Sequence, residues 1–486
     1  MTFDSADQLR SRLAEVGRVE GQRLVLEDPA MLRAELIDEL IFGAVFNPDE
    51  GLRDACRWAI WAASQELGCG SASVYELYMA RGRGEFPATH FTVPALNLRA
   101  TAYLSAQQAF TAAMQRDAGT VIFEIAKSEM AYTDQRPAEY TAAILAAAIK
   151  TGWPGPVFLQ GDHFQFNLAK WNADPDAELE ALRSLTREAV SGGFLNIDID
   201  SSTLVDLSRP TVPDQQHVNA ENTAELTRLI RQLEPEGVTI SIGGEIGEVG
   251  KENSTEEELR AYLDAYRYAL GTDAGALAGI AKVSIQTGTS HGGVPLPDGS
   301  IASVKIDLDT LQRLSTVARD EYGLAGCVQH GASTLPDEAF HHFPSAGAAE
   351  IHLATGFQNI LFDQAGLPPE LHREMMAWVE TNCADERMPD QTQEQFVYKS
   401  RKKAIGAFKR ELWTMPDAAA SQIADNLRAK FGQLFDELGI AGTRALVERF
   451  VSPPRLDQPL PPAFGGEAGQ AVFAAASVFE PDPSGE

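Results

Sequence analysis

The fold is decided by a stretch that reads PVFLQGDH, residues 156–163. It is a short apolar run that ends abruptly in a glycine, an acid and a histidine, as a buried β-strand does where it leaves a sheet. Seven further apolar runs of this kind lie along residues 90–360. They are Phe91–Leu98, Thr120–Ile125, Phe194–Ile199, Gly237–Ile242, Lys282–Gln286, Leu324–Gln329 and Glu350–Ala354. The pattern therefore predicts eight strands.

Amphipathic helical stretches separate nearly all of these runs. Clear examples are Ser105–Gln115, Ala138–Ile149, Ala177–Ala189, Thr223–Leu233, Glu256–Leu270 and Leu308–Glu321. The alternation predicts an α/β fold of the (β/α)8 TIM-barrel type, in which parallel strands close on themselves. An open doubly wound sheet is the alternative, but it often carries a glycine-rich phosphate turn after its first strand. No GxGxxG follows Phe91–Leu98 and no GxxxxGK[ST] occurs, so the barrel is favoured.

The remaining sequence flanks this barrel on both sides. Residues 1–88 predict an N-terminal helical extension that caps the barrel or contributes to an oligomer interface. Residues 89–365 form the predicted barrel, and residues 366–450 predict C-terminal helices. Proline and glycine dominate residues 451–486, which predicts a tail with little regular structure.

Composition excludes several classes of function. The 486 residues carry a formal net charge of -29 at pH 7, which would repel a nucleic-acid backbone. No apolar stretch approaches the ~20 residues of a membrane helix, and nothing resembles a signal peptide. The 4 cysteines have no paired spacing, which indicates reduced thiols rather than a Cys-rich zinc site. We therefore expect a cytoplasmic protein without membrane or nucleic-acid partners.

Three histidines and a glutamate follow predicted strands at the same end. His163 ends the third strand, Glu245 follows the fifth, His291 follows the sixth and His330 ends the seventh. Because the carboxyl ends of barrel strands meet at one rim, these side chains are expected to converge. Imidazole nitrogens and a carboxylate suit zinc, or another divalent metal of similar preference, with an open position for substrate. One such histidine is ordinarily a satisfied, half-buried side chain, but three at one rim favour a metal site.

Asp162 leaves two interpretations open. Strict strand alternation would point it away from His163, so both reach the mouth only if the strand ends or twists there. The structural interpretation is a helix cap or a partner that orients an imidazole. The functional interpretation is a general acid/base beside a metal-bound substrate.

The ordered set of polar segments resembles the class II, metal-dependent fructose- and tagatose-bisphosphate aldolase family. The segments are VPALN (93–97), GDH (161–163), IDSS (199–202), GEIG (244–247), GTSHG (288–292) and HGAS (330–333). The set is specific, although no single piece of it is. The resemblance implies one catalytic Zn²⁺ per chain, a small phosphorylated sugar as substrate, and a homo-oligomer.

The resemblance also implies a role for each matching side chain. In that family the histidines that match His163, His291 and His330 hold the metal, and the carboxylate that matches Glu245 is an alternative or second ligand. The metal acts as a Lewis acid that stabilises the enediolate left when the C3–C4 bond of the ketose breaks. Asp200 matches a position that supports the metal ligands or holds a secondary monovalent cation.

Proton transfer and phosphate binding follow from the same resemblance. The aspartate that matches Asp162 donates and accepts the proton at the aldehyde oxygen. A loop carboxylate is expected to handle the second proton transfer, with Glu252 the candidate and Glu248 the alternative; an ordinary exposed loop acid would look the same. Phosphate is held by backbone N–H groups and a serine at positions that match Gly292, Gly331 and Ser333. Backbone donors bind an oxyanion without a net positive protein.

Some substrate-binding positions depart from the family pattern. Where the family has Lys-x-Asn-x-x-Thr, this chain reads EIHLAT over residues 350–355, so His352 replaces the Asn that contacts the bound ketone. Thr355 matches the threonine, and Asn97 closes the first motif; we expect both near the substrate. Ala126 stands where a phosphate-binding serine is usual. The positions of the metal ligands and of the acid/base residue therefore match the family, while those that would contact the rest of the substrate differ from it.

Three hypotheses of function follow. The leading one is a zinc-dependent class II aldolase that cleaves or forms a C–C bond in a phosphorylated ketose or a related sugar acid. The second is a non-catalytic partner subunit, such as some tagatose-bisphosphate aldolases have, whose strand-three segment also reads Gly-Asp-His. The third is a related metal-dependent sugar epimerase or lyase, because enediolate chemistry serves both reactions. Ketose cleavage separates the first from the third, and bound metal separates both from the second.

Overall fold

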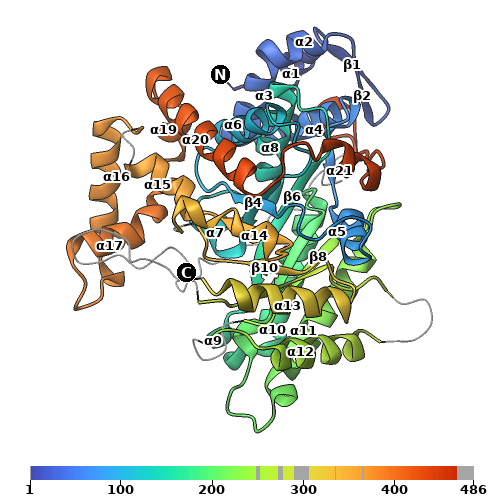
Figure 1. Cartoon of the computed structure of the whole chain (residues 1–486). Coiled ribbons are helices and arrows are strands. Elements are labelled where there is room, and N and C mark those ends of the chain that lie inside the picture. Colours follow the sequence, from blue (N-terminus) through green and yellow to red (C-terminus); the bar gives the residue numbers. More distant parts are fainter. Residues whose placement is uncertain are drawn as a thin grey trace.

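Eight parallel strands form a closed barrel at the centre of the computed structural model (Figure 1). The structure describes residues 2–247, 252–271, 277–288, 306–333, 335–363 and 366–467. The strands are β4 (Val93–Asn97), β5 (Ile122–Ala126), β6 (Val157–Gln165), β7 (Asn196–Asp200), β8 (Ser241–Glu245), β9 (Lys282–Ile285), β10 (Cys327–Gln329) and β11 (Glu350–Leu353). Each pairs in parallel with the next, and β11 pairs with β4. The predicted (β/α)8 barrel and its eight strands are confirmed.

Helices cover the outside of this barrel. They include α6 (Ala102–Met114), α8 (Pro137–Thr151), α10 (Pro175–Ser191), α11 (Val212–Leu233), α12 (Glu256–Leu270), α13 (Leu308–Asp320) and α15 (Thr355–Asp363). Helix α8 shows why they form where they do. It begins with Pro137, which suits the first turn, and ends before Gly152, whose φ of 73° makes a left-handed cap. Nearly all of its residues are buried.

The N-terminal extension is mostly helical but also adds strands that the sequence did not predict. Its main elements are α1 (Ala6–Leu13), β1 (Gly17–Glu20), β2 (Arg23–Leu26), α3 (Ile37–Phe46), α4 (Glu50–Glu66), β3 (Ser71–Ala72) and α5 (Tyr75–Gly82). Strands β1 and β2 form an antiparallel hairpin. Strand β3 pairs with the first residues of β6, where Ser71 is opposite Val157. The extension therefore covers the amino-terminal end of this barrel strand.

The C-terminal region packs against the barrel on another side. Its helices include α16 (Pro369–Asn382), α17 (Gln393–Ser400), α19 (Lys409–Trp413), α20 (Asp417–Glu437) and α21 (Arg444–Phe450). Helix α20 packs on α6 and α15 (Figure 1). After α21 the chain runs back along α4, where Trp61 Nε1 donates to the Leu456 carbonyl (2.6 Å) and Trp58 Nε1 to that of Gln458 (3.2 Å). The described part of the proline-rich tail is thus held against the extension.

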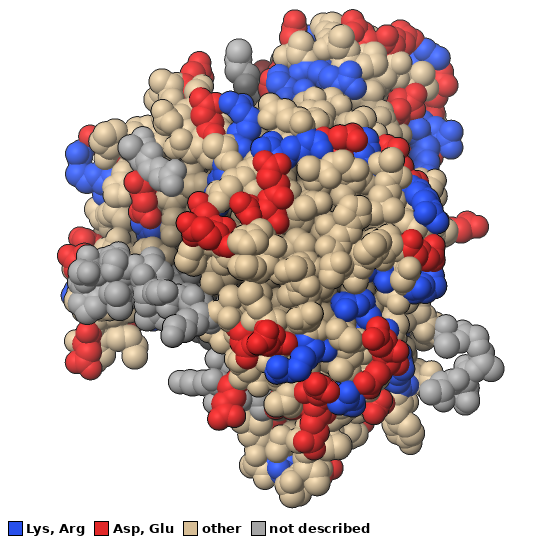
Figure 2. Space-filling view, in the orientation of Figure 1, with Lys and Arg blue, Asp and Glu red and all other residues tan. Residues whose placement is uncertain are grey.

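Two features of the described residues bear on partners. None of their helices combines the length and the apolar character needed to cross a bilayer. On the face shown in Figure 2, Lys and Arg side chains lie among Asp and Glu side chains rather than in one continuous basic area.

Candidate active site

A bulge in β6 brings Asp162 and His163 to the same end of the barrel. The pairing of β6 with β7 shifts register between Gly161 and Phe164, and His163 has a φ of 41°. Phe164 folds back against Gly161, where an added Cβ would lie 2.4 Å from its ring, so only glycine fits. A bulge turns neighbouring side chains out of strict alternation. His163 Nε2 consequently lies 3.8 Å from Asp162 Oδ1.

Five side chains from four strands meet beside this bulge, and we call them the rim cluster. They are Asp162 and His163 from β6, Asp200 from β7, Glu245 from β8 and His330 directly after β10. His163 Nδ1 is 3.0 Å from Asp200 Oδ2 and 3.3 Å from Glu245 Oε2. The His163 and His330 rings are 4.3 Å apart, and His330 Nε2 is 2.8 Å from Ser284 Oγ. The structure therefore brings together every described residue that the sequence proposed as a metal ligand.

The donor atoms of the rim cluster fit a divalent metal. Ligand atoms lie within 4.8 Å of one another in two overlapping groups, Asp162–His163–His330 and His163–Asp200–Glu245. This mixture of imidazole nitrogen and carboxylate oxygen is the ligand set of zinc and metals of similar preference. His291 and Gly292, together with the alternative loop acid Glu248, lie outside the described residues.

Crowded carboxylates give the rim cluster its electrostatic character. Burial, followed by repulsion from Asp200, raises the pKa of Glu245 to about 7 despite the attraction of His163. Burial opposes the charged form of His163, but the carboxylates of Asp162 and Glu245 hold the pKa of its imidazole well above the usual value. Among the described residues, His163 is the only positive partner of Asp200 and Glu245. A cation at this position would relieve the repulsion among the carboxylates.

A second cluster of charges, which we call the interior cluster, fills the barrel beneath the rim. It consists of Glu124, Asp198, Lys282, Glu350 and His352, all buried. Lys282 Nζ bonds Glu350 and lies 2.9 Å from Asp198 Oδ2. His352 connects the two clusters, with Nδ1 3.1 Å from Asp162 Oδ1 and Nε2 2.7 Å from Glu350 Oε1. The sequence prediction placed His352 against the substrate, and it did not recognise the rest of this network.

The other predicted substrate-binding residues lie around the mouth in different settings. Asn97 Nδ2 donates to Glu129 and is 3.5 Å from Asp162 Oδ2. Ser333 Oγ accepts from the Ala354 N–H at 2.6 Å, and Gly331, with a φ of 67°, begins the same turn. Thr355 is buried at the start of α15.

Glu252, the predicted loop acid, stands apart from these residues. It is exposed, and none of its described contacts is with the rim cluster. The structure does not place it beside Asp162, and its role stays a prediction.

Two functional candidates near Asp162 were missed by the sequence analysis. Glu129 accepts from Asn97 and from the Ala126 N–H, and Arg99 Nε donates to Glu129 Oε1 at 2.6 Å. Arg99 could have been recognised from the sequence, because it lies two residues after Asn97, the last residue of the first family motif. Glu129 gave no signal, because it lies at the start of a short helix, α7 (Lys127–Tyr132), that only the fold places there.

Comparisons with known proteins agree with this architecture. A search of curated proteins found no match. Among solved structures, the chain is similar to the fructuronate-tagaturonate epimerase UxaE from Cohnella laeviribosi, with 11% identity, a TM-score of 0.50, and coverage of 72% of this chain and 81% of that one. It is also similar to a fructose-bisphosphate aldolase from Campylobacter jejuni (16% identity, TM-score 0.44, 77% and 96% covered) and to the YdjI aldolase from Escherichia coli K12 (15% identity, TM-score 0.39, 72% and 99% covered). At these identities the first likeness shows the fold alone.

The family itself is identified by a match along the sequence. The model of the class-II fructose-bisphosphate aldolase family matches residues 86–411, which is more than half of the chain and includes the whole barrel. That range contains every residue of the rim cluster and of the interior cluster. The chain therefore belongs to the class-II fructose-bisphosphate aldolase family.

Proposed function

We propose that this protein is a zinc-dependent aldolase that cleaves or forms a C–C bond in a ketose, either a phosphorylated one or a related sugar acid. The observation that carries the proposal is the β6 bulge. It delivers an acid, Asp162, and a metal-type ligand, His163, side by side to the end of the barrel where His330 and Glu245 also arrive. Active sites of such barrels lie at this end.

The metal would be held by side chains of the rim cluster. His163 and His330 offer imidazole nitrogens and Glu245 a carboxylate, with His291 expected as a further ligand. When bound, a divalent cation supplies Lewis-acid stabilisation of the negative charge that develops on the substrate's oxygens. Asp200 fixes the ring of His163 through its contact with Nδ1 (3.0 Å).

Asp162 is the group proposed to move the proton. Its carboxylate is buried beside His163 and is approached by Asn97 Nδ2 at 3.5 Å and His352 Nδ1 at 3.1 Å. These two neighbours orient it toward the hydroxyl whose oxygen becomes the aldehyde when the C–C bond breaks. Removal of that hydroxyl proton is general base catalysis, and its return in the reverse reaction is general acid catalysis.

Epimerisation of a ketose is the second candidate function. It would use the same cleavage, followed by rotation of the retained aldehyde and re-formation of the bond. The contact of Asp162 with His352 favours it, because a second proton-carrying group then lies within 3.1 Å of the first. The two reactions differ in outcome, since only the aldolase releases two products.

The test is turnover by the zinc-loaded full chain on a panel of ketose phosphates and ketose acids, followed by NMR. We expect two smaller carbonyl products from at least one member, or a single epimer if the second candidate holds. Asp162→Asn should retain the metal and lose turnover by roughly 10²- to 10⁴-fold, the usual contribution of an acid/base group. Asp206→Asn, at a half-buried loop position where the aspartate pairs with Arg209, is the control. Conversion of no ketose by a metal-loaded protein would contradict the proposal.

A further inference from the structure

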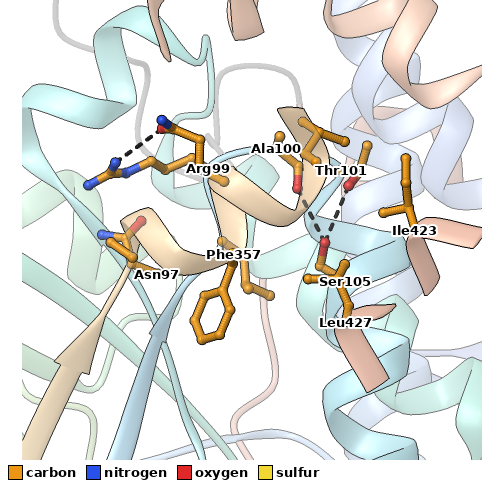
Figure 3. Close-up of a pocket in the computed structure, with 12 residues that line it drawn as sticks. Asn97, Arg99, Ala100, Thr101, Ser105, Phe357, Ile423 and Leu427 are labelled. Atoms are coloured by element: carbon orange, nitrogen blue, oxygen red, sulfur yellow. Dashed lines mark hydrogen bonds between the residues drawn. The ribbon is translucent and has the colours of Figure 1, made fainter. Parts of the chain in front are cut away.

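Arg99 places a guanidinium at the edge of the mouth, on the turn between β4 and α6. Its Nε donates to Glu129 Oε1 at 2.6 Å, and its Nη1 lies 3.2 Å from Gln358 Oε1 and 3.5 Å from Thr355 Oγ1. In Figure 3, Arg99 and Asn97 extend to the same side, away from Ile423 and Leu427 of α20. The guanidinium thus points away from α20 and toward Glu129.

The turn that carries Arg99 is held in an uncommon conformation. Thr101, the residue before α6, has a φ of 47°, which is rare for a threonine. Ser105 Oγ lies 3.3 Å from both the Ala100 carbonyl and Thr101 Oγ1, as Figure 3 shows. Gln135 Nε2 donates to the carbonyl of Arg99 itself at 2.8 Å. Strained segments that their surroundings fix in place gather at functional sites, where they pre-organise a side chain.

Arg99 is connected to the proposed reacting groups through two side chains. Asn97 Nδ2 contacts both Asp162 and Glu129, and Glu129 in turn accepts from Arg99. A substrate that reacts at Asp162 is thus separated from Arg99 by the width of two side chains, Asn97 and Glu129.

The hydrogen bonds around Arg99 leave donors unused. Among the described residues nothing accepts from Nη2, and nothing accepts from the amide nitrogen of Gln358. Thr355 and Gln358 are both more than nine-tenths buried. The cavity behind Arg99, lined also by Leu98 and Phe357, has a volume of about 20 Å³, enough for roughly one water. An anion must therefore approach these donors from the side of the mouth.

The local charge distinguishes between two kinds of anion. Glu129 is buried and already balances the charge of Arg99, and its Oε2 also accepts a hydrogen bond from the Ala126 N–H. Two other buried cations among the described barrel residues have carboxylate partners as well: Lys127 pairs with Glu178 and Lys282 with Glu350. A phosphate dianion would therefore lie next to Glu129 with one guanidinium to offset it. A planar monoanion needs less compensation and matches the fork of a guanidinium.

We propose that Arg99, with Thr355 and Gln358, binds a carboxylate at the far end of the substrate, which makes the substrate a ketose acid. The inference rests on the proposed function, since it assumes that a ketose reacts at Asp162. Among the two substrate types that function allows, it selects the sugar acid over the phosphate ester.

The test uses three ketohexoses that differ only at C6. Fructuronate carries a carboxylate there, fructose a hydroxymethyl group and fructose 6-phosphate a phosphate ester. Calorimetric titration of the zinc-loaded full chain should show fructuronate binding at least tenfold more tightly than either of the others. Arg99→Met should remove that preference, and Arg99→Lys should keep part of it. Equal affinity for the three sugars, or tighter binding of the phosphate ester, would overturn the inference.

Two further variants keep the test decisive. Arg444→Met is the matched control, because Arg444 Nε also donates to a carboxylate (Asp117, 2.8 Å) and its side chain is 17% exposed against 12% for Arg99. Asp117 precedes β5, at the opposite end of the barrel. Arg99→Met leaves the buried Glu129 carboxylate without its cation. If the variant does not fold for that reason, the double variant Arg99→Met/Glu129→Gln replaces it and should likewise lose the preference for fructuronate.

The readouts separate this inference from the proposed function. If Arg99→Met retains the carboxylate preference while ketoses are converted in an Asp162-dependent manner, the inference fails and the function stands. If the preference depends on Arg99 but no ketose is converted, the function fails and a carboxylate site remains.

Discussion

The rim cluster and the interior cluster occupy the same barrel and have nearly the same composition, but they differ in the source of their positive charge. In the interior cluster Lys282 Nζ lies among Glu350, Asp198 and Gln160, so the chain supplies its own cation. In the rim cluster, the His163 imidazole is the only positively charged partner that Asp200 and Glu245 have among the described residues. Ligand atoms are spaced for a metal in both clusters. The comparison teaches that spacing alone does not define a metal site, and that the local charge balance has to be counted as well.

The pKa values of the carboxylates are mixed within each cluster. Burial raises those of Glu124 and Asp198 in the interior. At the rim, burial opposes the charged form of Asp200, but hydrogen bonds from His163 and Ser202 lower its pKa.

The contrast between the clusters is clearest for Glu350 and Glu245. Burial disfavours the charged form of Glu350, but Lys282 and His352 together hold its pKa far below the usual value. At the rim, burial and Asp200 raise the pKa of Glu245 to about 7. Glu350 therefore has its cation within the folded chain, whereas a cation bound at the rim would relieve the repulsion on Glu245.

The largest effect is expected from removing the interior cation. Lys282→Met leaves Glu350 and Asp198 buried without their ammonium partner, which should cost about 3–5 kcal/mol of unfolding free energy. Urea denaturation followed by circular dichroism measures the change. Lys282→Met/Glu350→Gln, which also removes a negative charge, should recover part of the loss. A single variant as stable as wild type would show that the interior cluster does not depend on its lysine.

A comparably large effect, on metal affinity instead of stability, is expected at the rim. Zinc binding by a full ligand set is worth about 10–16 kcal/mol, so each of four ligands contributes about a quarter of that free energy. His330→Ala should therefore weaken Zn²⁺ binding by roughly 10²- to 10³-fold. Competition with a chelating indicator measures the affinity. His341→Ala is the control, because His341 is an exposed histidine whose ion pair is with Glu437. Unchanged affinity in His330→Ala would remove this residue from the ligand set.

A smaller effect is expected from the residue that connects the two clusters. His352→Asn restores the residue usual in the family but removes the imidazole that contacts Asp162 and Glu350. The kcat should fall by about 10- to 100-fold, as is typical when a supporting hydrogen bond is lost, while zinc content stays unchanged. Steady-state kinetics on the best ketose of the panel give kcat and KM separately. A change in KM alone would instead assign His352 to substrate binding.

The sequence predicted the barrel well because each strand carries its own signal. Runs such as Leu324–Gln329 are apolar on both faces up to the polar residue that ends them, which is how strands of parallel sheets read. The hairpin β1–β2 was missed because Arg18, Glu20 and Arg23 make it polar and exposed. Strand β3 has two residues, too few for any periodicity.

The candidate site was predicted only in part, for physical reasons. The carboxyl ends of strands are predictable positions, so His163, Glu245 and His330 were found. The orientation of Asp162 was left open because it depends on the register between β6 and β7, a property of two strands that neither sequence shows alone. Glu124, Lys282 and Glu350 each look like an isolated charge in an apolar run, and only the closed barrel reveals that all three hydrogen-bond to the side chain of Gln160.

The most direct test of the account is the number of metal ions bound per chain after exhaustive dialysis against zinc-containing buffer, measured by elemental analysis. Wild type and Glu350→Gln should each hold one zinc, because the interior cluster does not contribute to the site. The double variant His163→Ala/His330→Ala should hold none. Retention of zinc by that double variant, or its loss from Glu350→Gln, would show that the metal binds in the interior and would contradict the assignment of the rim cluster.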